Sequence, residues 1–282
     1  MNIERIESAA TILANGKVLV AGGRNGSYEL PNAELYDPIT SVWENTGNMN
    51  SPRHTFTVSL LSNGKVLAAG GYVNFYSISN SAELFDPSIG IWTYTNNMSN
   101  SRHSHTATVL KNSKVLVTGG LDDHDAMKSS DLYDPSTELW TYAGSMNYRR
   151  YYHTATLLAC GKVLVAGGRD FDNVLASAKL FDPSTESWTK TGSMNSPRTG
   201  FTATLLENGK VLVIGANHYG GSGSPIEIYD PVTELWTDLE NLNMKQQHTE
   251  STLNNEKVLL DGKDPLVSFF NKTEIYDALK QN

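Results

Sequence analysis

Arginine and histidine recur at fixed positions along this 282-residue chain, and these are the side chains best able to bind or transform a ligand. The arginines fall 48 or 49 residues apart, at Arg5, Arg53, Arg102, Arg150 and Arg198. Histidines share one position of the same period, at His105, His153 and His248. Guanidinium groups offer forked donors to acidic ligands, and imidazoles bind metals or exchange protons near neutral pH. The spacing indicates that any site is built from several copies of one sequence unit.

The tryptophans show the length of that unit. Trp43, Trp92, Trp140, Trp188 and Trp236 are 49, 48, 48 and 48 residues apart. Glycine pairs and Asp-Pro dipeptides keep the same period, and a sixth, altered copy of the dipeptide stands at 277–278. A period near 50 residues is typical of stacked or circular architectures, because one unit cannot bury its apolar face alone. We therefore predict six units.

Each unit has the pattern of four short strands, without a helical period. In the fourth unit the first three strands are predicted at 153–158, 162–166 and 178–181, and the fourth begins at Trp188. Cys160 and Gly161 occupy the first turn, where other units have Asn-Gly, a pair that favours a type I′ hairpin. Asp182-Pro183 marks the turn after the third strand. The fold class is therefore all-β, with four-stranded antiparallel units.

The glycine pair, the Tyr/Phe-Asp-Pro, the tryptophan and the segment from Met194 to Arg198 resemble the kelch repeat, over essentially the whole chain. The resemblance implies a six-bladed kelch-type β-propeller, and we expect one domain over 1–282. The last blade is expected to be incomplete, because the chain reaches residue 282 without a sixth tryptophan strand. The expected blades cover residues 8–49, 54–98, 103–146, 152–194, 200–244 and 248–277. Kelch propellers include adaptors, oxidases, sugar isomerases and plant specifier proteins, so the repeat says little about function.

Composition excludes several classes of function. A net charge of −8 and a pI near 5.4 argue against a nucleic-acid surface. One cysteine, Cys160, gives neither a disulfide framework nor a zinc set. The chain shows no apolar run of about 20 residues and no signal-peptide pattern at 1–10, so we expect a soluble protein without a membrane partner. We also expect a monomer without a cofactor; the compartment is left open.

Antiparallel strands place alternate connections on opposite faces, and the eight arginines all fall on one of them. This variable-loop face contains the loops after the glycine pairs and the segments between blades, whereas the lysines of the first hairpins lie on the opposite, hairpin-turn face. We predict a recognition face, with these candidate ligand-binding residues: Arg5, Arg53, Arg102, Arg150, Arg198, His105, Tyr152, His153 and His248. A single repeat arginine is more readily explained as holding a loop, because nearly every blade has one.

An enzyme is the alternative. Residues 150–154, Arg-Tyr-Tyr-His-Thr, resemble a stretch of the galactose-oxidase-like copper radical enzymes, which implies Tyr152 and His153 as copper ligands. The family also needs a cysteine–tyrosine link, and Cys160 is seven residues, roughly 23 Å of strand, from His153, so we expect that this link cannot form. His105, His153 and His248 could still converge as a metal site, and a sugar isomerase with an Arg, His and Glu pocket stays open. We predict a non-catalytic recognition or scaffold module that binds a protein segment or a polar or glycan ligand, with no metal and no catalytic residue.

Overall fold

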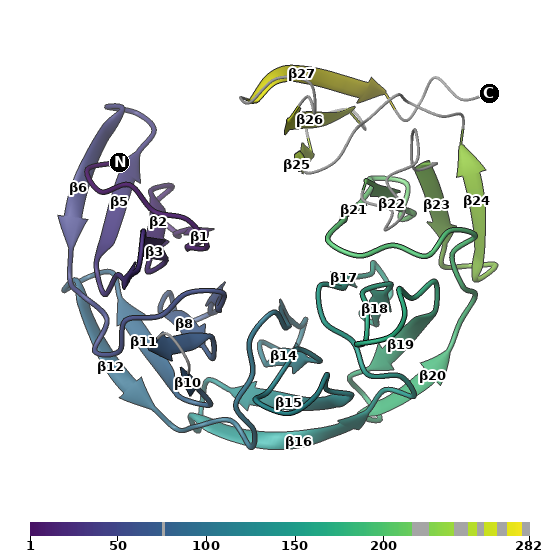
Figure 1. Ribbon diagram of the computed structural model, residues 1–282, viewed down its shortest axis with the longest axis horizontal. Helices are drawn as coiled ribbons and strands as arrows, with labels where there is room; N and C mark the ends of the chain where they lie inside the picture. Colours follow the sequence, from purple (N-terminus) through teal and green to yellow (C-terminus); the bar gives the residue numbers. More distant parts are fainter. Residues whose placement is uncertain (75–76, 216–225, 240–247, 253–256, 264–269, 278–282) are drawn as a thin grey trace. The chain divides into compact units, whose positions relative to one another are not determined.

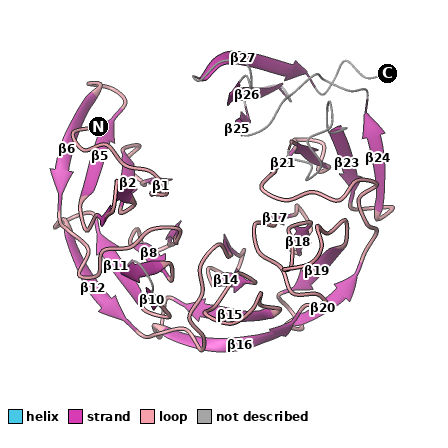
Figure 2. Ribbon diagram, in the orientation of Figure 1, coloured by secondary structure: helices cyan, strands magenta, loops and turns pink. Residues whose placement is uncertain are grey.

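A computed structural model describes residues 1–74, 77–215, 226–239, 248–252, 257–263 and 270–277. The described residues form strands joined by loops and turns (Figure 2). They include no helix long and apolar enough to cross a membrane. The chain divides into two compact units, Met1–Asn147 and Tyr148–Asn282, which are described separately below.

The first unit contains three four-stranded antiparallel sheets, each built from one continuous segment of the chain (Figure 1). Blade one consists of β1 (Ala9–Ile12), β2 (Val18–Ala21), β5 (Ala33–Asp37) and β6 (Val42–Thr46). Blade two consists of β7 (Thr57–Leu60), β8 (Val66–Ala69), β11 (Ala82–Asp86) and β12 (Ile91–Thr95). Blade three consists of β13 (Thr106–Val109), β14 (Val115–Thr118), β15 (Ser129–Asp134) and β16 (Leu139–Ser145). Two short hairpins that the sequence did not predict lie in the variable loops: β3 (Arg24–Asn25) with β4 (Tyr28–Glu29), and β9 (Tyr72–Asn74) with β10 (Ser77–Ile78).

The second unit repeats the design. Blade four consists of β17 (Thr154–Leu157), β18 (Val163–Ala166), β19 (Ala178–Asp182) and β20 (Ser187–Lys190). Blade five consists of β21 (Thr202–Leu205), β22 (Val211–Ile214), β23 (Ile226–Asp230) and β24 (Leu235–Leu239). A three-stranded sheet follows, formed by β25 (His248–Thr252), β26 (Lys257–Lys263) and β27 (Phe270–Asp277). The four-stranded antiparallel unit is thus confirmed; the count of six blades and the single domain stay predictions.

The apolar core lies between neighbouring blades. The second strand of blades one to five is almost wholly apolar and buried, as in Val-Leu-Val-Ala of β18, because it is covered on both faces. One cluster joins Leu19 and Met49 of blade one to Val66, Phe85 and Trp92 of blade two. A blade therefore buries its apolar face only when the next one is present, which is the physical basis of the repeat.

The tryptophans link blades as well as fill space. The Nε1–H of Trp92 donates to the carbonyl of Gly47 in the preceding blade at 2.9 Å. Trp140 makes the same bond to Asn96 at 2.8 Å, and Trp236 to Gly192 at 2.9 Å. Each of these rings also packs against the aromatic residue of the third strand, with Phe85 and Trp92 centroids 5.0 Å apart. These tryptophans of the repeat therefore lie at the contacts between neighbouring blades.

The first hairpin of each blade differs from the type I′ turn that Asn-Gly favours. In blade one the amide of Leu13 donates to the carbonyl of Lys17, and Gly16 donates back to Leu13. Only Gly16 has a positive φ, +82°, whereas type I′ needs positive φ at two residues. The loop is therefore a three-residue turn that ends in one left-handed residue. Asn15 is selected for its side chain instead, since its Oδ1 accepts the amide of Lys17 at 3.1 Å.

The glycine pair is required by close backbone approach. A Cβ on Gly70 would lie 2.5 Å from the carbonyl oxygen of Arg102 in the next blade, and one on Gly71 would lie 2.5 Å from that of His54. Both residues have positive φ, +68° and +87°. The amide of Gly71 donates to the Arg102 carbonyl at 2.9 Å. The pair thus fixes the arginine segment of its own blade and that of the next.

Candidate recognition face

The repeat arginines are buried. Arg53, Arg102, Arg150 and Arg198 are 0% exposed, and Arg5 is 9% exposed. The expectation that these guanidinium groups line an exposed face is therefore wrong. The side chain turns into the blade because its donors find main-chain carbonyls and, in most blades, a carboxylate there.

Arg53 shows what the guanidinium does. Its Nη1 donates to the carbonyls of Gly70 and Ser81 at 2.9 and 3.1 Å, and its Nη2 donates to the Glu83 carboxylate at 2.8 Å. The amides of Asn50 and Ser51 complete the shell of that carboxylate, at 2.7 and 3.0 Å. One buried ion pair thus holds the between-blade segment, the glycine pair and the third strand together. This is the loop-holding role that the recurrence of the arginine favoured.

Two residues after each of the five repeat arginines, the backbone adopts a left-handed conformation. These residues have φ between +51° and +61° and are Glu7, Thr55, Ser104, Tyr152 and Gly200. In unit one the amide of Thr55 donates to the carbonyl of Glu7 at 3.1 Å, and that of Ser104 to Thr55 at 3.4 Å. In unit two Gly200 donates to Tyr152 at 3.0 Å. The conformation costs a non-glycine residue about 1 kcal/mol or more, and these bonds between blades offset it. Sequence reasoning missed this feature, although the glycine of the fifth copy was a signal for it.

The residue between the arginine and the left-handed residue pairs with the first residue after the glycine pair. These bridges join Ile6 to Arg24, His54 to Tyr72, His103 to Leu121 and Tyr151 to Arg169. Each of these four blades therefore presents three side chains from a fixed backbone, and their identity differs from blade to blade. We name this set the variable triplet: the two residues after the repeat arginine and the first residue after the glycine pair. Differing side chains on a constant backbone are the arrangement expected of a recognition surface.

In unit one the triplets bring imidazoles and a phenol together. Tyr72 stacks on His54 with ring centroids 4.9 Å apart, and its hydroxyl lies 3.0 Å from Nε2 of His103. Burial, together with the charge of His54, lowers the pKa of His103 to about 4. Glu7 lies beside this stack, with its carboxylate 3.7 Å from Nε2 of His54 and within hydrogen-bond distance of Arg24. The stack is thus a neutral, mostly buried support with an exposed ion pair at its edge.

In unit two the triplet of blade four and the nearby Phe171 form an aromatic cluster with two exposed rings. Tyr151 is buried, with its ring centroid 5.1 Å from that of Tyr152 and 6.4 Å from that of Phe171. The Arg169 guanidinium lies over the Tyr151 ring, 5.8 Å from its centroid. Tyr152 and Phe171 are 50% and 54% exposed. Two accessible rings and a guanidinium therefore rest on one buried ring.

The remaining predicted residues do not all reach this surface. His105 and His153 are 7% and 6% exposed, and Nε2 of His105 lies 3.0 Å from the Thr57 hydroxyl. His248 begins β25, and its side chain lies outside the described residues. Within the described part of the chain, no group of three or more His, Cys, Asp or Glu side chains could hold a metal ion. Cys160 is exposed in the turn between β17 and β18, at the end of β17 away from His153. The prediction of no metal site, and the alternative of a histidine or copper site, thus stay untested.

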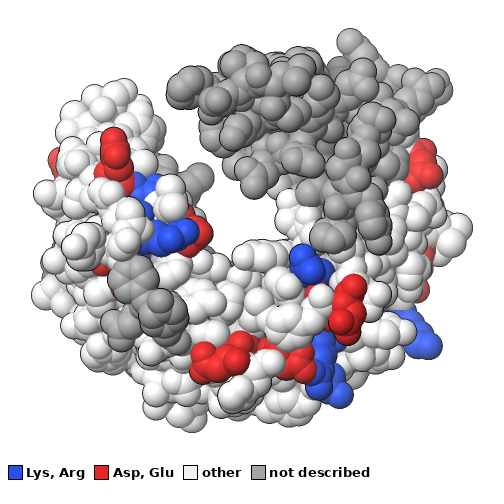
Figure 3. All heavy atoms as spheres, viewed as in Figure 1, with Lys and Arg blue, Asp and Glu red and all other residues white. Residues whose placement is uncertain are grey.

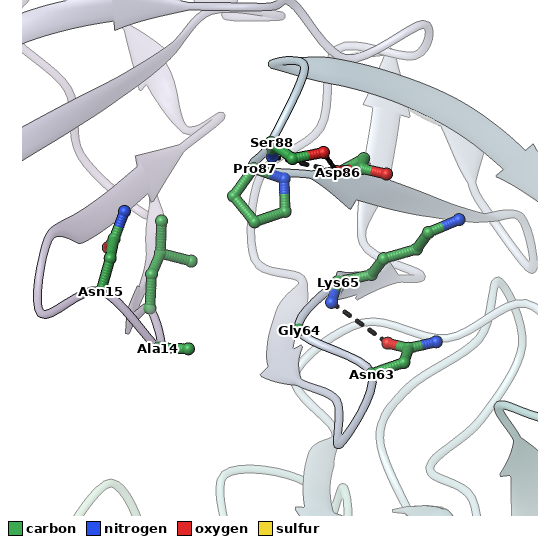
Figure 4. Close-up of a pocket in the computed structure, with 9 residues that line it drawn as sticks. Ala14, Asn15, Asn63, Gly64, Lys65, Asp86, Pro87 and Ser88 are labelled. Carbon is green, nitrogen blue, oxygen red and sulfur yellow. Dashed lines mark hydrogen bonds between the residues drawn. The ribbon is translucent and has the colours of Figure 1, made fainter.

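Among the described residues, each unit has an equivalent cavity between its hairpin turns. In unit one, the turn at 13–15, the turn at 63–65 and the Asp86-Pro87-Ser88 turn surround about 390 Å³ (Figure 4). In unit two, residues 159–160, 208–210 and 230–232 surround about 350 Å³ in the same way. The amide of Ser88 donates to the Asp86 carboxylate at 2.9 Å, and Lys210 lies 3.1 Å from Asp230. Because the cavity recurs between blades, we attribute it to the repeat and not to a specific ligand.

Charge does not single out one face as basic. Figure 3 shows acidic and basic side chains near one another on the viewed face, with wide uncharged areas between them. The first-hairpin lysines pair with Asp-Pro carboxylates, as Lys162 does with Asp182 at 3.6 Å. Of the eight arginines, three are exposed or half-exposed, namely Arg24, Arg149 and Arg169. Charge alone therefore does not distinguish the variable-loop face.

Comparison with known families agrees with this architecture. The antiparallel four-stranded sheets, without a helix among the described residues, are those of a kelch β-propeller. The KLHDC2/KLHL20/DRC7 Kelch-repeats domain matches residues 54–262, and the Kelch motif matches residues 8–50. The first match covers more than half of the chain, which therefore belongs to the kelch-repeat family. A comparison with curated proteins gave no match. Kelch domains generally mediate protein interaction.

Proposed function

We propose that this protein is a non-catalytic interaction module whose variable-loop face binds a protein segment. The observation that carries the proposal is the exposed cluster of Tyr152 and Phe171 on buried Tyr151, with Arg169 beside it. Tyrosine and phenylalanine offer large contact area at a low cost in rotamer entropy, and tyrosine and arginine dominate binding hot spots. The repeat arginines contribute by holding the segment that carries these residues, and not by touching the ligand.

A protein segment fits this surface better than a small anion does. The cluster is apolar at its centre, and Asp170 and Asp172 lie beside Phe171 in the chain, so the rim is mixed in charge. A peptide with an apolar side chain flanked by polar ones would bury the two rings and retain hydrogen bonds at the rim. Glycans also stack on aromatic rings, and the test below separates the two ligand classes.

The experiment is a selection from a displayed peptide library, with a glycan array in parallel, on the 282-residue chain. Selected peptides are then measured against the variant Tyr152→Ser/Phe171→Ser and the matched variant Val232→Ser/Tyr142→Ser. The latter residues are 89% and 60% exposed but lie outside the aromatic cluster, in an Asp-Pro turn and an outer strand. We expect the first variant to lose binding at least tenfold and the second to retain it. Equal losses in both variants, or glycan binding without any selected peptide, would overturn the proposal.

A further inference from the structure

Blade four departs from the ion pair that anchors the repeat arginine elsewhere. In the other four blades with a repeat arginine, Nη2 meets a carboxylate at one position of the third strand. These pairs are Arg5–Glu34, Arg53–Glu83, Arg102–Asp131 and Arg198–Glu227, with N–O distances of 2.7, 2.8, 2.7 and 2.7 Å. All eight side chains are 0% exposed. In each case the carboxylate compensates for removing the guanidinium from water.

Blade four has Lys179 at this position. The strand is not shifted, because Lys179 pairs with Val165 of β18 as Glu227 pairs with Val213 of β22. Arg150 keeps its remaining bonds, to the carbonyls of Gly167 and Ser177 at 2.7 and 2.9 Å and to the Ser177 hydroxyl at 3.0 Å. It is still fully buried. Two cations therefore stand where the other blades have a cation and an anion.

The neighbours of this pair do not neutralise it. Lys179 is 4% exposed, and among the described residues its ammonium has no hydrogen-bond or ion-pair partner. The residue opposite Lys179 in β20 is a third cation, Lys190. Burial lowers the pKa of Arg150 to about 10, and burial together with the charges of Lys190 and Arg150 lowers the pKa of Lys179. Three cations, Arg150, Lys179 and Lys190, thus lie together in blade four, although the protein as a whole carries a net charge of −8.

The other blades show which group belongs in this place. Three of their four carboxylates accept an arginine Nη2 and also main-chain amides of the segment before the arginine, as Glu227 does from Asn195 and Ser196 at 2.7 and 3.1 Å. Asp131 of blade three has a shorter side chain, and it accepts Arg102 through Oδ2 while its Oδ1 has no partner among the described residues. Tyr148 holds the place of Ser196 in blade four. No acceptor for its amide lies among the described residues. The donors of an anion site are therefore present without the built-in anion.

We propose that blade four binds a small oxyanion at Lys179, with the Tyr148 amide, Arg150 and Lys190 as the surrounding donors and charges. Carboxylate, phosphate and sulfate share the required chemistry, which is a negative charge spread over oxygens that accept several N–H bonds. The bound ion replaces the carboxylate of the other blades and stabilises the fold in proportion to its occupancy. This inference does not depend on the proposed protein-binding role.

The test uses the 282-residue chain in chloride at constant ionic strength, with inorganic phosphate, sulfate or acetate titrated in. Melting temperature is recorded by tryptophan fluorescence, and phosphate affinity by calorimetry. We expect a saturable rise of roughly 3 to 5 °C at phosphate tenfold above its dissociation constant. The melting temperatures in sulfate and in acetate are compared with that in phosphate, because the three ions differ in charge and in the arrangement of their oxygens.

Two variants make the result specific. Lys179→Glu restores the pattern of the other blades, so it should melt higher than the parent in chloride and lose the phosphate response. Lys179→Met removes the charge without adding an acceptor, and its phosphate affinity should fall at least tenfold. Phosphate that stabilises the parent and Lys179→Met equally would be a general salt effect and would overturn the proposal. The proposal would also be overturned if none of the three oxyanions raised the melting temperature of the parent and only a higher pH did. Lys179 would then be stabilised as the neutral amine and would need no counter-ion.

Discussion

Replacing Arg53 by methionine should be far more damaging than the loss of one surface charge. The substitution keeps an unbranched apolar stem but removes donors to Gly70, Ser81 and Glu83. It also leaves a carboxylate that is 0% exposed without its counter-charge. Breaking a buried ion pair by removing one partner costs about 3 to 5 kcal/mol. A domain of this size gains roughly 5 to 15 kcal/mol from folding, so the melting temperature should fall by roughly 6 to 20 °C.

The assay is equilibrium unfolding in urea, followed by tryptophan fluorescence, with a matched surface variant. Arg24→Met removes a guanidinium that bonds Glu7 at 2.9 Å, but these side chains are 37% and 40% exposed. That pair should contribute less than about 1 kcal/mol. The double variant Arg53→Met/Glu83→Met completes a cycle, and it should be more stable than Arg53→Met because no unpaired charge stays buried. Equal effects of Arg53→Met and Arg24→Met, or a double variant less stable than the sum of both single changes, would refute the reasoning.

Three further outcomes follow from the described contacts. Trp92→Ala should cost about 3 to 5 kcal/mol in urea unfolding, and Trp92→Phe less, because phenylalanine keeps one aromatic ring of the packing while it loses the rest of the indole and the bond to Gly47. An unchanged midpoint for the alanine variant would contradict a stabilising role of Trp92 between blades. His103 has a folded pKa of about 4, below its ordinary value, so its neutral form stabilises the fold above about pH 6.5 and that contribution is lost as pH falls toward 4. Melting temperatures at pH 8 and pH 5 should therefore differ more in the parent than in His103→Gln, and an equal difference would show that the buried imidazole does not titrate in this way. Cys160 is exposed, so one thiol should react with a disulfide reagent in the folded protein, and a thiol that reacts only after unfolding would contradict its place in the turn.

Local sequence patterns predicted the blade well. The alternation of short apolar runs with Asn-Gly and Asp-Pro turns depends only on neighbouring residues, and β17 to β20 fall within a residue or two of the strands expected in the fourth unit. The Asp-Pro turn also forms as expected, with the Asp86 carboxylate accepting the amide of Ser88. The prediction of a type I′ turn was wrong. Asn-Gly favours that two-residue turn, but the bond from the Leu13 amide to the Lys17 carbonyl closes a loop of three residues.

The candidate site was predicted only in part. Tyr152 is exposed on the variable-loop face as expected, whereas the repeat arginines are buried. A sign of their burial existed in the sequence, because Glu83 stands between apolar neighbours in a predicted strand, where an unpaired acid would be costly. Its connection to an arginine 30 residues earlier is a contact between distant segments, and the repeat pattern does not show it.

The sequence by itself determined the repeat, the four-stranded unit and the kelch family, since these depend on period, turn chemistry and the burial of apolar strands. The tertiary structure decided which polar side chains face solvent, because that depends on partners brought together from distant parts of the chain. Arg53 and Arg150 show the difference. They occupy the same repeat position and are equally buried, yet Arg53 pairs with the carboxylate of Glu83 whereas blade four has Lys179 at the equivalent position of its third strand. The cost of that difference depends on burial and on partners, which only the folded blade provides.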